Sequence, residues 1–337
     1  MHPELLKIPF VNLTIKTYGT MMVIGFLVAL WVIRRMAGRI GQKPDTIANL
    51  ALYALLAGIV GARLFYVAHY FEQFRDRLWT IPAVWQGAGE FLGGVIMAVG
   101  FILVYLYLKK LPIRVYVDIL AVGLMIGLGF GKIGCFMNGC CYGKIHNGFP
   151  SVRFPYASLA YYSQAFPDYA RNRPKPYLDL PAEFYAAVED GKIIAQATEA
   201  DKFGHSLKPF DLLTKQQKQQ VTTGEYRCLP VHPTQLYSSL EAFVWAGAMY
   251  LLWRKTALTR PGLVTSALLI AYGVSRFFIE TFRDDNPFES SWWILYKGGT
   301  ISQNLCLYMI ALGVVLTTLL VLRRPRTGNN PNRPDKK

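Results

Sequence analysis

Charged residues, and acidic ones above all, are scarce in this sequence. Only 17% of its 337 residues are charged and 53% are hydrophobic, with 21 Asp and Glu against 36 Lys and Arg. Soluble globular domains carry about 25% charged residues, so the composition argues against a soluble protein. It indicates instead a chain that lies largely within a membrane.

Polar stretches are also few, because apolar runs fill most of the chain. Several runs reach the roughly 20 residues needed to cross a hydrocarbon core of about 30 Å. Seven such runs lie at about 18–36, 47–70, 91–108, 115–133, 234–253, 263–282 and 301–322. The sequence therefore predicts an all-α integral membrane protein with seven transmembrane helices.

The segment between the fourth and fifth runs is too polar to cross a bilayer and is expected to form an extramembrane head. The predicted division is residues 1–143 for helices 1–4, 144–231 for the head, 232–322 for helices 5–7, and 323–337 for a basic, disordered tail. Within the head we expect helix-like stretches and an aromatic cluster at the headgroup level. These are Leu180–Gln196, Phe210–Val221, and Tyr156, Tyr161, Tyr162, Phe166 and Tyr169.

The net charge of +15 arises from basic residues in alternate loops. They follow the first span, separate the third from the fourth and the fifth from the sixth, and follow the seventh. The positive-inside rule places these loops in the cytoplasm, with the N-terminus and the head outside. Topology and contact with anionic lipid explain the charge, so a nucleic-acid partner is not expected. No cleavable signal peptide precedes residue 18, and the first span is expected to remain as an anchor.

Cysteines number five, and regular zinc-ligand spacing is missing. Cys306 falls in the last span and is most simply a small core residue. Cys135, Cys140, Cys141 and Cys228 are expected on the outer side, which is oxidising in most bacteria, so disulfides are open to them. Disulfide or plain packing is favoured over a metal, because Cys-x4-Cys-Cys lacks the usual Cys-x2-Cys pairs. No metal or cofactor is expected.

Ionisable residues inside spans are costly, so each one is a functional candidate. The spacing of Arg276, Glu280 and Arg283 in the sixth span places all three on one helical face. They form either a structural ion triad or a cationic site for phosphate, which guanidinium groups bind bidentately. Arg63 and Lys132 are two further cations in apolar surroundings.

Two other motifs lie at span ends. GKIGCFMNGCCYG, residues 131–143, is glycine-rich, which is typical of a close-packed or sharply turned helix end. VHPTQLY, residues 231–237, opens the fifth span with His232 before a proline. This histidine is either a local hydrogen-bonding group or a catalyst.

In order and spacing, the motifs resemble those of the prolipoprotein diacylglyceryl transferase family over nearly the whole chain. The head is the part without a clear counterpart. The matching motifs, in chain order, are TYG, GAR, GG, G-[RK]-x-G-x-F-x-N-G-x-x-x-G, HPTQLY, RPG-x9-YG-x2-RF-x2-E-x2-R and SQ. The resemblance implies transfer of a diacylglyceryl group from phosphatidylglycerol to the lipobox cysteine of a preprolipoprotein, with release of glycerol phosphate. The expected partners are phosphatidylglycerol, preprolipoprotein signal peptides and the bilayer of the bacterial inner membrane.

The resemblance also assigns roles to individual residues. It carries the phosphate-holding role onto Arg276, with Glu280 and Arg283 as ion-pair and gating partners, and it matches Tyr18 to the family's essential tyrosine. The remaining substrate-binding residues are expected to be Arg63, Lys132, Asn138, Gly139 and Gly143.

The sequence departs from the family pattern at four positions. Lys132, Cys135 and Cys140 stand where the usual signature has Arg, Asn and Glu, and Lys lacks the bidentate fork of Arg. Leu92 stands where the family has a catalytic His. His232 is the preferred replacement as base, with Glu90 as a second candidate, unless the thiol ionises unaided beside the cations. A repurposed or inactive paralogue remains the alternative, and a transporter is disfavoured because no repeat is visible.

The topology is directly testable. Reporter fusions after Lys110, Lys255 and Lys337 should read cytoplasmic, and a fusion within 160–220 should read external, as the positive-inside rule requires. A cytoplasmic signal from the head would contradict the seven-span arrangement.

Overall fold

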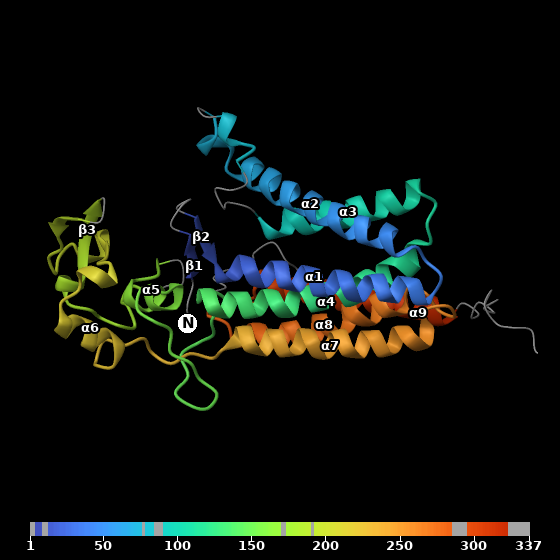
Figure 1. Ribbon diagram of the computed structural model, residues 1–337. Coiled ribbons are helices and arrows are strands. Elements are labelled where there is room, and N and C mark those ends of the chain that lie inside the picture. The colour runs from blue at the N-terminus through green and yellow to red at the C-terminus, as the bar shows by residue number, and fades with distance from the viewer. Residues whose placement is uncertain are drawn as a thin grey trace, which may run out of the picture. The chain divides into compact units, whose positions relative to one another are not determined.

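A computed structural model describes residues 4–8, 13–75, 78–83, 90–169, 173–189, 192–284 and 295–322. Within these ranges the framework consists of long helices (Figure 1). They are α1 (Thr17–Arg39), α2 (Pro44–His69), α3 (Phe91–Leu108), α4 (Ile113–Asn138), α7 (Thr234–Thr256), α8 (Leu263–Thr281) and α9 (Ile301–Leu322). Each predicted apolar run coincides with one of them. The predicted tail, 323–337, lies outside the described residues.

Five of these helices are long and apolar enough to cross a membrane, namely α1, α2, α4, α8 and α9. Helix α3 is apolar but shorter. Helix α7 has the length but is more polar, since it contains Gln235, Ser238, Ser239 and Glu241. The chain is therefore a multi-span membrane protein.

The chain divides into two compact units, and each is described by itself. The second unit comprises Phe26–Ile126, Trp245–Ile270 and the chain from Leu312 onwards. Within it, α2 and α3 form a glycine-packed pair. A Cβ added at Gly61 would lie 2.7 Å from the Gly93 carbonyl oxygen, and one at Gly94 would lie 2.9 Å from that of Gly58. Glycine at these positions lets the two backbones approach closely, as in other membrane helix pairs.

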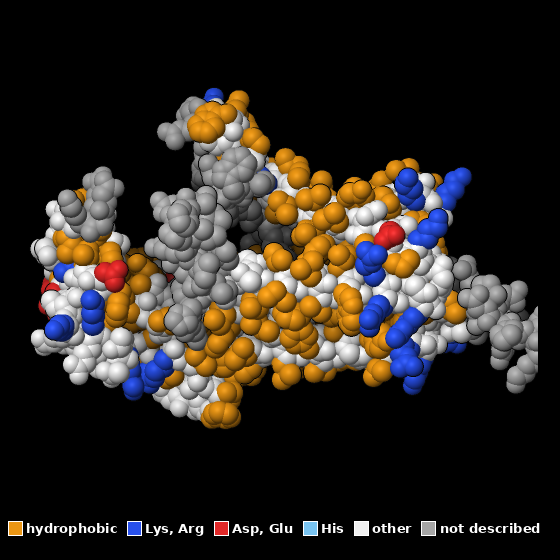
Figure 2. All heavy atoms as spheres, viewed as in Figure 1, with side chains coloured by type: hydrophobic (Ala, Val, Ile, Leu, Met, Phe, Trp, Pro, Cys, Tyr) orange, Lys and Arg blue, Asp and Glu red, His pale blue; other side chains and the backbone are white. Residues whose placement is uncertain are grey.

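The three basic connections of this unit lie at the same end of its helices, where blue side chains gather in Figure 2. The Tyr116 hydroxyl donates to Gln42 Oε1 at 3.2 Å, which joins the first connection to the second. The Asp118 carboxylate accepts hydrogen bonds from the backbone N–H groups of Gly262 and Thr265 at 2.6 and 2.8 Å, which joins the second to the third. The first turns of α4 are thus hydrogen-bonded both to the loop after α1 and to the segment at the start of α8.

The first unit comprises the chain up to Gly25, Gly127–Val244 and Ala271–Ala311. It contains the head and one half of each of several long helices. The chain enters it through an antiparallel pair, β1 (Glu4–Ile8) and β2 (Leu13–Lys16).

The head holds a small antiparallel sheet in the order β4-β3-β5, with two short helices. The elements are α5 (Leu159–Ala165), β3 (Tyr185–Glu189), β4 (Lys192–Gln196), β5 (Ser206–Leu207) and α6 (Lys215–Thr222). The predicted helix over Leu180–Gln196 is therefore wrong. Its sequence carries Asp190–Gly191 between two apolar runs, a hairpin signal that outweighs the helical pattern. The stretch Phe210–Val221 is helical as predicted, but in two pieces, a 3-10 turn at Phe210–Leu212 and then α6.

Aromatic residues build the core of the head. Tyr161, Phe184 and Tyr185 are fully buried, and the Tyr161 hydroxyl donates to the Tyr226 carbonyl at 2.7 Å. Of the five aromatic residues predicted at the headgroup level, only Tyr161 is fully buried in the head core, where it cannot rest among headgroups. Tyr169 is exposed.

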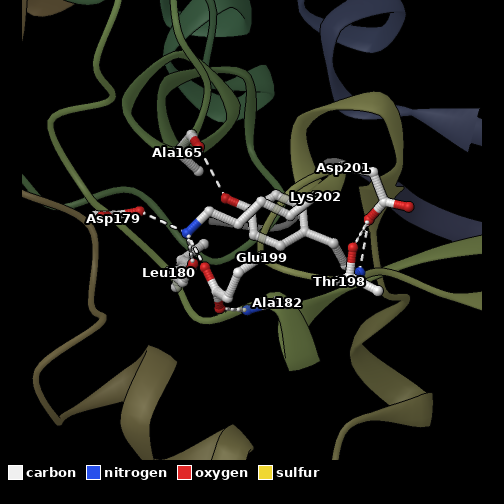
Figure 3. Close-up of polar contacts among 9 residues, drawn as sticks. Ala165, Asp179, Leu180, Ala182, Thr198, Glu199, Asp201 and Lys202 are labelled. Carbon is white, nitrogen blue, oxygen red and sulfur yellow. Dashed lines mark hydrogen bonds and ion pairs between the residues drawn. The ribbon is translucent and has the colours of Figure 1, made fainter.

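One buried lysine ties the segments around this core together. Lys202 Nζ lies 2.8 Å from carboxylate oxygens of both Asp179 and Glu199, and its ammonium points between them (Figure 3). It also donates to the Leu180 carbonyl at 2.9 Å. A buried ammonium is tolerated only when its three donors are used in this way.

The α2–α3 packing generates a stability prediction. Gly61→Ala should lower the free energy of unfolding by about 1–3 kcal/mol, the usual cost of overpacking. The matched control is Gly100→Ala in α3, where an added Cβ meets nothing within 4 Å. Thermal unfolding of the two purified variants in detergent checks this, and equal midpoints would contradict the close approach.

Candidate active site

The end of α4 forms a tight, fully hydrogen-bonded turn. Gly139 has φ +75°, and its N–H donates to the Phe136 carbonyl at 3.3 Å, while the Cys140 N–H donates to the Cys135 carbonyl at 3.2 Å. This pair of bonds is a Schellman motif, which needs a left-handed residue such as glycine after the last helical position. The turn folds Cys140 back over Cys135, the residue one turn before the helix end.

The chain beyond the turn is hydrogen-bonded between two other segments. The Gly143 N–H donates to the His232 carbonyl at 3.0 Å, and the Lys144 N–H donates to the Phe282 carbonyl at 2.8 Å. A Cβ at Gly143 would lie 2.7 Å from that Phe282 oxygen. Only glycine fits this position, where the end of α8 and the entry to α7 meet the loop.

The start of α7 holds the loop's remaining carbonyl groups. Thr234 Oγ1 donates to the Cys141 carbonyl, and Gln235 Nε2 donates to the Cys140 carbonyl, both at 2.7 Å. The HPTQ segment therefore fixes the backbone of the cysteine loop, a role that its sequence did not reveal.

The three ionisable residues of the sixth span meet as their spacing predicts. Arg276 Nη2 lies 2.6 Å and Arg283 Nη1 3.8 Å from Glu280 Oε2, and Glu280 is buried. Thr300 Oγ1 donates to Glu280 Oε1 at 3.2 Å. Arg276 Nη1 is buried and has no hydrogen-bond partner among the described residues. The guanidinium therefore keeps one donor for a further acceptor.

A second carboxylate, Glu241 of α7, escaped the sequence reasoning. It accepts a hydrogen bond from the Ser275 hydroxyl and interacts electrostatically with Arg276 and Lys132. The signal was an acidic residue within a predicted span, but its partners are on other helices. Glu241 brings Lys132 into the same charged network as Arg276.

Three thiols gather at the turn. The Sγ atoms of Cys135, Cys140 and Cys141 all lie within 4.8 Å of one another, and each residue is partly exposed. The thiol groups of Cys135 and Cys140, together with the cationic Lys132 and Arg283, hold the pKa of Cys141 below its usual range.

Tyr18 and Asn138, two residues assigned by resemblance, lie beside these thiols. Tyr18 packs on Gly134, where an added Cβ would lie 3.1 Å from the ring, and it interacts electrostatically with all three cysteines. The Asn138 side chain hydrogen-bonds the Cys140 thiol.

Cys228, the fourth cysteine predicted on the outer side, does not join these three thiols. It is buried in the head core, which raises its pKa to about 11, and its thiol donates to Gln164 Oε1 at 3.3 Å. It is a packed core residue.

His232 lies at the same junction of segments. Its ring stacks on His146 with centroids 4.0 Å apart, and its Nδ1 lies 3.2 Å from the Tyr237 hydroxyl. Burial, and then the neighbouring His146, lower the pKa of His232. The imidazole is therefore neutral at neutral pH and able to accept a proton.

Arg63 and Leu92 belong to the second unit. Arg63 donates to the backbone carbonyls of Thr80 and Ile81 at 2.7 and 2.9 Å, with its guanidinium over the Phe74 ring. These contacts fasten the segment after α2, and a substrate-binding role for Arg63 stays a prediction. Glu90, the second candidate base, also lies in this unit, whereas the other predicted site residues lie in the first unit.

Glu90, two residues before Leu92, has a partner that the sequence reasoning missed. His69, at the end of α2, places Nδ1 2.8 Å from a carboxylate oxygen of Glu90. The carboxylate of Glu90 thus orients an imidazole within the second unit.

The site thus combines two arginines, the buried Glu280, the partly buried Glu241 and three partly exposed thiols at the ends of apolar helices. The family model of prolipoprotein diacylglyceryl transferase matches residues 3–319. The chain belongs to this family of membrane transferases of lipoprotein biosynthesis.

Relatives from enteric bacteria agree over almost the whole length. Proteins of Escherichia fergusonii and Citrobacter koseri, both named phosphatidylglycerol–prolipoprotein diacylglyceryl transferase, are 28% identical over 314 residues. A protein of the same name from Cronobacter sakazakii is 28% identical over 317 residues. Each alignment covers 92% of this chain and 90% of the relative.

Proposed function

We propose that this protein transfers the diacylglyceryl group of phosphatidylglycerol to the lipobox cysteine thiol of preprolipoproteins. The proposal rests on the state of Arg276. Its guanidinium is paired with Glu280, and its buried Nη1 has no hydrogen-bond partner among the described residues. A phosphate oxygen is the acceptor that suits such a donor. The names of the relatives, which specify phosphatidylglycerol and prolipoprotein, support it.

The topology proposed with this function has seven spans in the bacterial inner membrane. Helices α3 and α7 join the five apolar helices, the N-terminus and the head (144–231) lie outside, and the tail is cytoplasmic. This places the loop of residues 139–145 at the outer face. Lipid and acceptor peptide meet there.

In the proposed mechanism Arg276 binds the phosphate of the lipid. As the bond between the glyceryl carbon and the phosphate oxygen breaks, negative charge grows on the leaving group, and a fixed guanidinium stabilises it most in the transition state. Arg283 shares Glu280 with Arg276 and acts as its gate. Lys132, linked to Arg276 through Glu241, adds positive charge.

The acceptor side consists of Tyr18 and the signature loop. Tyr18 and Asn138 contact the thiol-lined turn, while Gly139 and Gly143 set its backbone. These residues position the acceptor cysteine. Its thiol must ionise before it attacks, because only the thiolate is a good nucleophile.

A repurposed paralogue with another lipid or acceptor is the second candidate. Leu92, which cannot take a proton, is the observation in its favour. Rescue of a strain depleted of its own transferase separates the two: growth supports the transferase, and failure with a correctly inserted protein supports the paralogue.

Arg276 provides the sharpest test of the proposed reaction. Arg276→Ala should abolish transfer to a lipobox peptide from phosphatidylglycerol, and Arg276→Lys should retain little, because a point charge replaces a fork. Arg283→Ala should impair transfer less. The matched control is Arg153→Lys in the head, which should leave the rate unchanged. Wild-type transfer by folded Arg276→Ala would reject the assignment.

His232 is the proposed base. His232→Ala should lower turnover by about 10²–10⁴-fold, the usual contribution of one acid–base group, and His232→Gln should fail equally. Because its pKa is lowered, activity should fall with decreasing pH only below about 6.5, and this acid limb should disappear in His232→Ala.

A different pattern would overturn this role. If Gln restores activity while Ala mainly lowers the yield of folded protein, His232 is structural. His69→Ala then tests the imidazole beside Glu90, and Leu92→His tests whether restoring the family pattern raises the rate.

A further inference from the structure

We propose that Cys135, Cys140 and Cys141 bind one zinc ion, and that its fourth position takes the thiol of the acceptor. The acceptor part rests on the proposed function, whereas the metal site itself does not. The spacing Cys-x4-Cys-Cys argued against a metal, but the structure brings the three sulfurs together.

The sulfur geometry suits a single ion. Zinc binds thiolates at about 2.3 Å with tetrahedral angles, so its sulfur ligands lie about 3.8 Å apart. The three Sγ atoms already lie within 4.8 Å of one another, and side-chain rotation closes the remaining difference. All three residues are partly exposed, so an ion has access.

The unusual spacing works because of the turn at Gly139. The bond from the Cys140 N–H to the Cys135 carbonyl stacks the two residues, as consecutive turns of a helix would stack them. Cys141 follows in a left-handed conformation with φ +58°, and its Sγ lies within 4.8 Å of the other two sulfurs. The bonds from Thr234 and Gln235 fix the two carbonyls, so the ligands are oriented before an ion arrives.

The surrounding charges and hydrogen bonds also fit. Three thiolates and Zn²⁺ carry a net charge of about −1, and a fourth thiolate makes it about −2. Lys132 and Arg283 interact electrostatically with Cys141 and offset this charge. Asn138 hydrogen-bonds Cys140, as outer groups around metal-bound sulfurs do.

Such an ion would promote ionisation of the acceptor thiol, which is otherwise left without the histidine that Leu92 replaces. A catalytic zinc keeps one position open, and a thiol that occupies it loses its proton. The proton goes to a neutral base, the role assigned to His232. The sulfur lone pair forms the bond to the glyceryl carbon, the carbon–oxygen bond breaks, and its electron pair leaves on the phosphate held by Arg276. The thioether product, being uncharged, binds zinc weakly and leaves.

The metal site is tested on the full-length protein in detergent, purified under reducing conditions and titrated with Zn²⁺. Wild type should bind one equivalent tightly, the triple Cys135→Ser, Cys140→Ser, Cys141→Ser variant none, and Cys140→Ser at least 10-fold more weakly. Cys228→Ala, which removes a thiol outside the cluster, should bind as wild type does. Unchanged binding by folded Cys140→Ser or the triple variant, or no binding by wild type, would overturn the site. So would a thiol count showing a disulfide in the active protein.

The open position is tested with Co²⁺ in place of zinc and lipobox peptides as probes. A peptide with its cysteine should raise the thiolate-to-cobalt charge-transfer absorption, and the peptide with serine should not. Equal responses would overturn the acceptor assignment. Transfer that survives complete removal of zinc would overturn the inference and leave the proposed function standing. If the cobalt-substituted protein gives the expected absorption change but the zinc-loaded protein does not transfer, the proposed function is rejected and the metal site still stands.

Discussion

The constraint on which the rest of the structure depends is the helix end at residues 138–145. A helix that stops near a membrane surface leaves carbonyl groups that must find donors, since water is scarce there. Gly139 supplies the backbone conformation, and donors from α7 satisfy the carbonyls that follow. The same bonds join α4, α7 and the end of α8, so the loop, the thiols and the arginine cluster share one scaffold.

The charged network is the second element of this scaffold. Breaking a buried ion pair by removing one partner costs about 3–5 kcal/mol, because the remaining charge is left uncompensated. Glu280 and Arg276 therefore each make the charge of the other tolerable within apolar helices. Glu241 extends the network to α4. A guanidinium that is paired with Glu280 and interacts electrostatically with Glu241 is preorganised for an anion, because its position is set before the substrate arrives.

The spans and the arginine face were readable from the sequence, because length, hydropathy and helical spacing are local properties. Residues 263–282 and Arg276, Glu280 and Arg283 are examples, and their positions are confirmed. The partners of Glu241 and the gathering of the thiols were not readable, since they depend on which helices pack together and on one left-handed turn. The strands over Tyr185–Gln196 were misread because short apolar runs fit a helix or a strand alike, and the turn signal Asp190–Gly191 between them was overlooked.

The neck of the head affects how freely the length of the head can change. Val231 pairs with both Ile145 and Val152, so the segments by which the chain enters and leaves the head are hydrogen-bonded to each other. Doubling the length of a loop whose ends already meet costs only about 0.6 kcal/mol in entropy. The chain entropy therefore permits large changes in the length of the head, provided that the pairing at this neck is kept.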